Sequence, residues 1–337
     1  MSQRSSLRDK HEHMGEREVT QIRSFIGATR RPGELGVHSL DEFNLIVPDM
    51  KVAETFYGEF GLELQPRGNR MEIRTQGHNH RWGTIVEGSR KRLSHFSFGV
   101  FEDDFSRFKD RLNNLHEPLL DAPPGFESSG LWFHSPDGLL IELRVADKSS
   151  PNEKSSFTMV SAPAGVQSAP SRTQAPRTKP RRLAHVLVFT ADVLASIAFY
   201  ERVLGLRLSD RSNDGIAFMH GIHGSDHHLL ALAKARGPGL HHLSWDVGSI
   251  NDIGLGAMHM ADKGYAAGWG LGRHVLGSNY FHYVRDPWGS YSEYSADIDY
   301  VPVNCDWPGQ DNPGHDSFYG WGPVTPEDFA VNYELAS

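Results

Sequence analysis

Two histidines and a glutamate on three short segments are the residues best suited to chemistry in this sequence. His185, His242 and Glu293 lie in residues 184–189, 240–247 and 291–295, which read as β-strands bounded by turn residues. The chain has a single cysteine, Cys305, so an intramolecular disulfide framework and a cluster of several thiolates are both excluded. Any bound metal ion must therefore take nitrogen and oxygen ligands.

Side-chain alternation along these strands allows the three side chains to face one cavity. His242 shares its face with Ser244 and Asp246, whereas His241 falls on the opposite, apolar face and is expected to be structural or to support a ligand. Two imidazoles and a carboxylate on one side of a metal leave positions open, which is typical of non-haem Fe(II) oxygenases. Alternation permits this convergence without proving it, since a single strand histidine is more often a core or surface residue.

The sequence carries the same pattern twice, on either side of a central segment rich in Ser and Pro. In each copy an apolar strand ends at an Asp, a Phe-Tyr pair follows on an amphipathic helix, and a Gly-Leu step leads into another strand. Each copy later has a four-residue turn before a strand that bears a glutamate. Such self-similarity indicates duplicated units. The matched positions are Asp49, 56–57, 61–62, 135–138 and Glu142 in the first copy, and Asp192, 199–200, 205–206, 286–289 and Glu293 in the second.

The unit implied by this repeat is a βαβββ module that is used in pairs. We therefore predict an α+β fold of two domains, each of paired βαβββ modules that form curled mixed sheets around a central cavity. The tail is rich in Gly, Pro and aromatic residues, and we expect it to fold over the cavity or to pack at a subunit boundary. The predicted boundaries are a flexible arm at 1–36, an N-terminal domain at 37–148, a linker at 149–180, a C-terminal domain at 181–302 and the tail at 303–337.

Over residues 38–302 these motifs resemble the vicinal-oxygen-chelate superfamily of glyoxalases, bleomycin-resistance proteins and dioxygenases. Within it they resemble the type I extradiol catechol dioxygenases. The resemblance implies that His185, His242 and Glu293 hold one Fe(II), with Mn(II) the less favoured metal. It also implies a catecholic substrate, O2 as the second reactant, meta ring cleavage in the catabolism of aromatic compounds, and assembly into a homo-oligomer.

Three more residues match motifs of that family. Residues 272–274 read Gly-Arg-His, and Tyr283 stands ten residues before Glu293. The resemblance implies that His274 and Tyr283 hydrogen-bond the bound catecholate, because aimed donors stabilise charge that develops on oxygen. His228 is the second member of a His-His pair before an apolar strand, where the family places an acid/base residue. An imidazole with an ordinary pKa of about 6.5 suits that role.

The N-terminal copy has possible ligands of its own. Shifted onto that copy, the ligand positions become Glu42, His95 and Glu142. The resemblance implies that this half is non-catalytic and free of metal, so a second metal site is the minor alternative.

Composition limits the classes of partner. The net charge of −8 argues against a protein that mainly grips phosphate backbones. No apolar run approaches the roughly 20 residues of a membrane helix, and the charged N-terminus lacks the apolar core of a secretory signal. We therefore expect no nucleic-acid or membrane partner, and a cytoplasmic location.

Two other functions stay open at this point, because one fold serves several activities. One is a metal-dependent isomerase or lyase of the glyoxalase type, which Glu42, His95 and Glu142 keep in view. The other is a small-molecule-binding protein without catalysis. His228, His274 and Tyr283 argue against both. The ring substituent is not specified, although four aromatic residues are candidates for the pocket wall: Phe218, Trp269, Tyr280 and Trp288.

Overall fold

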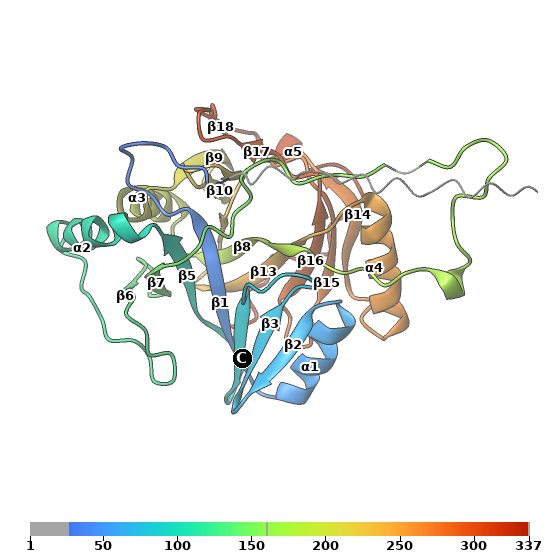
Figure 1. Ribbon diagram of the computed structural model, residues 1–337, viewed down its shortest axis with the longest axis horizontal. Coiled ribbons are helices and arrows are strands. Elements are labelled where there is room, and N and C mark those ends of the chain that lie inside the picture. Colours follow the sequence, from blue (N-terminus) through green and yellow to red (C-terminus); the bar gives the residue numbers. More distant parts are fainter. Residues whose placement is uncertain (1–26, 160, 336–337) are drawn as a thin grey trace, which may run out of the picture.

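The computed structural model describes residues 27–159 and 161–335. Two large mixed sheets dominate it (Figure 1), one from each half of the chain. The first sheet has the order β2-β3-β4-β1-β5-β7-β6. Its strands are β1 (Ser39–Val47), β2 (Glu63–Arg67), β3 (Arg70–Arg74), β4 (Gly83–Glu87), β5 (Arg92–Val100), β6 (Leu131–His134) and β7 (Leu140–Val145).

The second sheet has the order β18-β9-β10-β12-β8-β13-β16-β15-β14-β19, and a separate two-stranded sheet pairs β11 with β17. The strands of the large sheet are β8 (Arg182–Thr190), β9 (Arg207–Ser212), β10 (Ile216–His220), β12 (Leu230–Lys234), β13 (Gly239–Asp246), β14 (Gly268–His274), β15 (Tyr280–Arg285), β16 (Tyr291–Ala296), β18 (Gln310–Asp311) and β19 (Tyr319–Trp321). The small sheet consists of β11 (Ser225–Asp226) and β17 (Tyr300–Val301).

The helices occupy equivalent places in the two halves. One follows the first strand of each module, so the order is β1-α1-β2-β3-β4 and β5-α2-β6-β7, then β8-α3-β9-β10-β12 and β13-α4-β14-β15-β16. In the second module the second strand, between α2 and β6, is reduced to an isolated bridge between Leu120 and Trp132. The helices are α1 (Met50–Glu59), α2 (Phe105–Asn114), α3 (Val193–Leu204), α4 (Ile250–Asp262) and α5 (Gly314–Ser317), with short 3-10 turns η1 (Glu102–Asp104) and η2 (Arg172–Gln174).

These modules confirm the predicted α+β fold with paired βαβββ units. The local sequence explains the matching helix starts, since Asp49 and Asp192 each accept a hydrogen bond from a backbone N–H of the first turn. Helix α3 ends at Gly205, whose φ is 70°. A Cβ there would lie 2.4 Å from the carbonyl oxygen of Leu35, so only glycine fits this turn.

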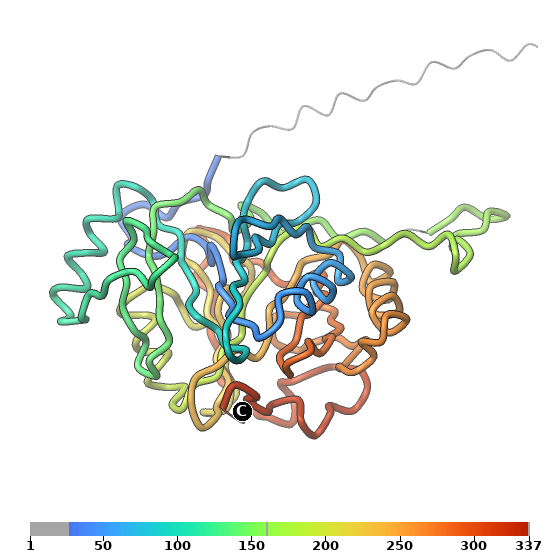
Figure 2. Tube along the Cα trace, turned by 90° about the horizontal axis from the view of Figure 1, so that it is seen from below, coloured from blue at the N-terminus to red at the C-terminus, as the bar shows by residue number. Residues whose placement is uncertain are grey.

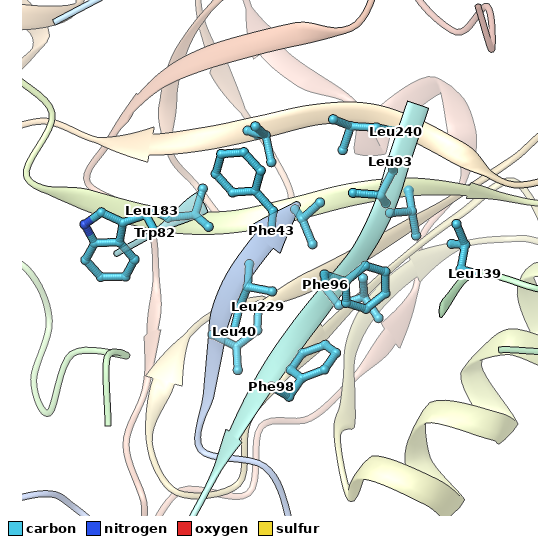
Figure 3. Close-up of a cluster of buried hydrophobic side chains, with 14 of the residues drawn as sticks. Leu40, Phe43, Trp82, Leu93, Phe96, Phe98, Leu139, Leu183, Leu229 and Leu240 are labelled. Carbon is cyan, nitrogen blue, oxygen red and sulfur yellow. The ribbon is translucent and has the colours of Figure 1, made fainter. Parts of the chain in front are cut away.

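The hydrophobic core lies between the halves. Figure 3 shows Phe43 of β1 and Phe96 of β5 beside leucines of the second half. The Phe43 ring meets Trp245 edge-on with centroids 6.0 Å apart, and Phe60 stacks on Tyr294 at 3.9 Å. This shared core fixes β13 and β16 from behind, on the faces that point away from the cavity described below.

The segments outside the two sheets are also placed. Residues 161–175 extend away from the body (Figure 2). Of the arm predicted at 1–36, residues 1–26 lie outside the described residues. The remainder packs on the body, where the Thr29 hydroxyl donates to the carbonyl of His223 and Arg30 pairs with Asp103 and Asp104. Within the described ranges, no helix combines the length and apolar character needed to cross a membrane.

Candidate metal centre

Three adjacent strands of the second sheet carry the predicted ligands. His185 is on β8, His242 on β13 and Glu293 on β16, and these strands lie side by side in the sheet (Figure 1). Ser244 on the central strand pairs with both His185 and Glu293. His242 lies two residues before Ser244, so its side chain points to the same face. Regular alternation therefore brings all three side chains to one side of the sheet.

The three side chains converge closely. The Nε2 atoms of His185 and His242 lie 3.2 Å apart, and Glu293 Oε2 lies 3.4 Å from the first and 3.6 Å from the second. Among the residues that the structure describes, this is the one group of three such side chains whose ligand atoms all lie within 4.8 Å of one another. Each of the three is at most 2% exposed. The geometry suits a single ion held between three inward-facing donors.

An unpartnered oxygen at this point fits a cation. Glu293 Oε2 is buried without a hydrogen-bond partner. Burial raises the pKa of Glu293, but the neighbouring His185 and His274 together outweigh it and hold this pKa below its usual value. A buried carboxylate with a free oxygen is costly unless a cation compensates it. Two imidazoles and a carboxylate match a divalent transition metal that keeps open positions.

His241 supports His242, in a position that strand alternation did not predict. The prediction that it lies on the opposite face is wrong, because His241 lines the same cavity. Leu240 pairs with Val188 and His242 with the neighbouring Leu187, so His241 is the extra residue of a β-bulge. Its Nδ1 lies 2.7 Å from Nδ1 of His242.

This contact sets the protonation of His242. Burial lowers the pKa of His241 to about 4, so its ring is neutral. Its Nε2 donates to the carbonyl of Phe329 at 2.8 Å, since a carbonyl only accepts. Nδ1 of His241 then accepts the proton on Nδ1 of His242. Nε2 of His242 is left with a lone pair directed at the proposed metal position.

The three predicted catalytic residues surround the same cavity, whose volume is about 310 Å³. His274 Nδ1 donates to the carbonyl of Phe318 at 2.9 Å, so its Nε2 accepts from the Tyr283 hydroxyl at 2.9 Å. The His228 ring lies 4.0 Å from that of His185. Burial and the neighbouring His185 hold the pKa of His228 well below its usual value. Burial also raises the pKa of Tyr283 well above its usual value. Neutral His228, as a hydrogen-bond acceptor, and the protonated hydroxyl of Tyr283, as a donor, therefore face the proposed metal ligands.

One residue of this site was missed from the sequence. Asn279, between β14 and β15, donates from Nδ2 to Glu293 Oε1 at 3.2 Å and to Ser295 Oγ at 3.0 Å. An amide that orients a metal-binding carboxylate is typical of the contacts around metal ligands. It lies in a turn where neither strand alternation nor the repeat gave a signal.

Comparison with known proteins identifies the family. The model of the Glyoxalase/Bleomycin resistance protein/Dioxygenase superfamily matches residues 182–294. The chain is 49% identical over 298 residues to metapyrocatechase 2 of Cupriavidus necator, covering 88% of this chain and 93% of that protein. The chain belongs to the extradiol dioxygenases. The predicted family and enzyme class are thus confirmed.

Two further relatives of this extradiol dioxygenase are more distant. An iron-dependent extradiol dioxygenase of Rhodococcus jostii is 32% identical over 128 residues, which is 34% of this chain and 43% of that protein. The crystal structure of homoprotocatechuate 2,3-dioxygenase from Arthrobacter globiformis superposes with a TM-score of 0.71 at 19% identity, covering 90% of this chain and 94% of that one. At that identity the likeness shows a shared fold.

The C-terminal tail of the dioxygenase closes the cavity. Phe318 and Phe329 line it together with helix α5, so the tail folds over the site, which is one of the two positions predicted for it. Of the four aromatic candidates for the wall, Phe218 lines the cavity and Trp269 stacks behind Tyr283 at 5.7 Å. The other two candidates are not among the lining residues. The apolar part of the wall is formed by Leu187, Ile216, Phe218, Leu276, Phe318 and Phe329.

The equivalent position in the N-terminal half is occupied by side chains of the chain itself. Glu42, His95 and Glu142 surround a cavity of about 220 Å³. Arg144 Nη1 lies 3.1 Å from Glu42 Oε2 and 4.0 Å from Glu142 Oε2, and Arg81 Nη2 lies 2.8 Å from the same Glu42 oxygen. Guanidinium groups therefore lie beside the carboxylates in the N-terminal half, at the position that corresponds to the candidate metal centre of the other half.

Proposed function

We propose that this extradiol dioxygenase holds Fe(II) on His185, His242 and Glu293 and cleaves the ring of a catechol next to its two hydroxyl groups. The observation that carries the proposal is the buried triad with a free carboxylate oxygen, at the base of a cavity bordered by His228 and Tyr283. The name of the Rhodococcus jostii relative supports iron. Mn(II), which takes similar ligands, is the less favoured metal.

When bound there, Fe(II) would supply coordination positions for a catechol and O2 and the redox capacity to pass electron density between them. The side chains supply proton transfer and orientation. His228 accepts the proton of one substrate hydroxyl, because its ring is neutral and faces the ligands. The Tyr283 hydroxyl turns from His274 to a substrate oxygen and stabilises negative charge on it. Phe318 and Phe329 of the tail cover the cavity and exclude water.

The cavity wall favours a catechol whose substituent is apolar or absent. Beyond the histidines, Asn279 and Tyr283 around the triad, its lining is mainly aliphatic or aromatic, with Ser212, Lys234 and Ser317 as the polar exceptions. Lys234, the one lysine or arginine in the described lining, pairs with Asp214 at the surface. An acidic substituent would enter the wall without a matching charge, which is unfavourable. We also retain the predictions of a homo-oligomer and a cytoplasmic location, the first of which size-exclusion chromatography tests.

The test is anaerobic reconstitution with Fe(II), Mn(II) or Zn(II), followed by O2 and a panel of catechols. We expect the Fe(II) protein to form yellow ring-opened products and to consume one O2 for each catechol. Glu293→Gln should lose bound iron and turnover together. The matched control is Glu142→Gln in the N-terminal half, which should retain both. Absence of product from every catechol, with zinc or no metal bound, would refute the proposal.

The alternative activity, that of a glyoxalase-type isomerase, requires a separate assay. Such an isomerase converts its substrate without consuming O2, so we would assay turnover of a hemithioacetal in the absence of O2. If this turnover occurs and is lost in both Glu293→Gln and Glu142→Gln, the result would favour an isomerase whose metal ligands come from both halves.

A further inference from the structure

His228 is the inner end of a hydrogen-bond chain that leads away from the cavity. Its Nδ1 lies 3.0 Å from Nδ1 of His227, and Nε2 of His227 lies 2.8 Å from Oδ2 of Asp210. Asp210 is on β9, which is separated by β10 and β12 from β8 and its proposed metal ligand. All three side chains are buried or nearly so. None of these three residues is a proposed metal ligand. Of the three, only His228 lines the cavity.

The partners of Asp210 fix the direction of this chain. Besides His227, its carboxylate faces the indole N–H of Trp307 at 3.3 Å, the backbone N–H of Gln310 at 3.1 Å and the amide of Asn312 at 3.5 Å. All of these are donors, so the carboxylate acts only as an acceptor. Nε2 of His227 must therefore carry a proton. With a neutral His227, its Nδ1 has a lone pair and accepts the proton on Nδ1 of His228.

We propose that Asp210 and His227 are positioning residues that hold His228 as its Nδ1–H tautomer, so that Nε2 presents a lone pair to the substrate hydroxyl. This inference rests on the proposed role of His228 as proton acceptor. In the opposite tautomer Nε2 would carry a hydrogen and could not accept the substrate proton. The contribution of Asp210 is thus orientation and tautomer choice, without contact with substrate.

A second histidine pair in the site follows the same logic. His241 stands to His242 as His227 stands to His228, with an Nδ1–Nδ1 contact of 2.7 Å. There the outer acceptor is the carbonyl of Phe329. Both pairs are anchored by a group that only accepts, and both leave Nε2 of the inner histidine free toward the cavity.

The C-terminal tail completes the chain around Asp210. Trp307, Gln310 and Asn312 belong to it, and the Trp307 ring also packs edge-on against His227 at 5.3 Å. Strand β18 pairs with β9 at Asp210 itself. The tail therefore holds the carboxylate in one orientation and covers it from solvent, while its later residues line the cavity.

Asp210→Asn tests the tautomer directly. The amide oxygen should face the two donors Gln310 and Asn312, which turns the Nδ2–H₂ group toward His227. Nε2 of His227 then accepts, its Nδ1 donates, and His228 becomes the Nε2–H tautomer. Because acid–base catalysis contributes about 10²- to 10⁴-fold, we expect kcat to fall at least about 100-fold with little change in KM. Asp210→Glu keeps an acceptor and should recover most of kcat.

The matched control is Asp311→Asn on the same tail segment. Asp311 accepts from the backbone of Asn213 and pairs with Arg211 without touching His227. Its kcat should equal that of the wild type. The tautomer is read from ¹⁵N chemical shifts of histidine-labelled full-length protein loaded with diamagnetic Zn(II), with His228 assigned by its loss in His228→Gln. Zinc content and circular dichroism report whether each variant folds.

The outcomes separate the inference from the function on which it rests. A reversed tautomer with a low kcat in Asp210→Asn, and normal values in Asp311→Asn, supports the proposal. An unchanged tautomer in Asp210→Asn, or equal losses in both variants, overturns it. Full turnover by His228→Gln would instead refute the acid/base role of His228, whatever tautomer the spectra show.

Discussion

Asn279→Ala should weaken metal binding without removing a metal ligand. The amide of Asn279 donates to Glu293 Oε1 at 3.2 Å and leaves Oε2 for the metal. A hydrogen bond to a charged acceptor contributes about 1.5–3 kcal/mol, and about 1.4 kcal/mol corresponds to a tenfold change in affinity. The expected loss is therefore about ten- to a hundredfold, which matches the usual effect of groups that orient ligands.

The lower part of that range is the better expectation. Asn279 also donates to Glu293 in the metal-free protein, so part of the energy is present in both states and cancels from the binding equilibrium. What remains is the cost of letting the carboxylate rotate away from the two histidines. We expect the affinity for Fe(II) to fall about tenfold.

Competition with a chelator under nitrogen measures this affinity, and the rise in melting temperature on metal addition provides a second reading. The matched control is Asn332→Ala, which loses two donated hydrogen bonds, to the carbonyls of Gly237 and Pro238, and one accepted from the backbone N–H of Glu334. It should lose comparable stability and bind metal as tightly as the wild type. Equal affinities in Asn279→Ala and the wild type would show that Glu293 is oriented by strand packing alone.

Three further substitutions test the fold and the N-terminal half. Tyr294→Phe loses a buried hydrogen bond of 2.8 Å to the carbonyl of Phe60, so urea unfolding should show a loss of about 1–2 kcal/mol with turnover unchanged. Burial lowers the pKa of His95 from 6.5 to about 3, so the unfolded chain binds a proton that the folded chain excludes, and stability falls as the pH drops through that window. His95→Gln should make this dependence shallower by about 1.4 kcal/mol per pH unit, and an identical slope would contradict the assignment. Arg144→Met leaves Glu42 with less compensation and should destabilise the protein by about 2–4 kcal/mol, measured in the same way.

The repeat and the strand alternation made much of this site predictable. The predicted segments at 184–189, 240–247 and 291–295 became β8, β13 and β16 with shifts of no more than two residues at their ends. Side chains on a strand alternate with a period of two, so the face of each ligand follows from local sequence. The duplication indicated which strands belong to one module, and the turn before each glutamate marked the start of the final strand.

The residues that alternation could not place depend on irregular backbone or on distant contacts. His241 was assigned to the wrong face because a bulge inserts one residue, and nothing in the apolar pattern marks a bulge. Asn279 acts from a turn. Asp210 reaches His227 only because β9 folds back, and its remaining partners come from the tail about a hundred residues later. Contacts of this kind become visible only when the strands are assembled.

The two halves meet one electrostatic requirement in two ways. Each module pair brings a glutamate of its last strand, Glu142 or Glu293, to a buried position facing a histidine of the neighbouring strand. In the N-terminal half Arg144, on the strand of Glu142 itself, lies 4.0 Å from Glu142 Oε2, and the hydroxyls of Ser97 and Ser128 donate to the same carboxylate. At the corresponding position after Glu293 the chain has Ser295, which leaves Glu293 Oε2 without a partner. A buried carboxylate needs a cation, so replacing this arginine by a small residue creates the demand for an external one. Among the described residues, Glu293 thus has no lysine or arginine partner, whereas Glu142 has Arg144 beside it.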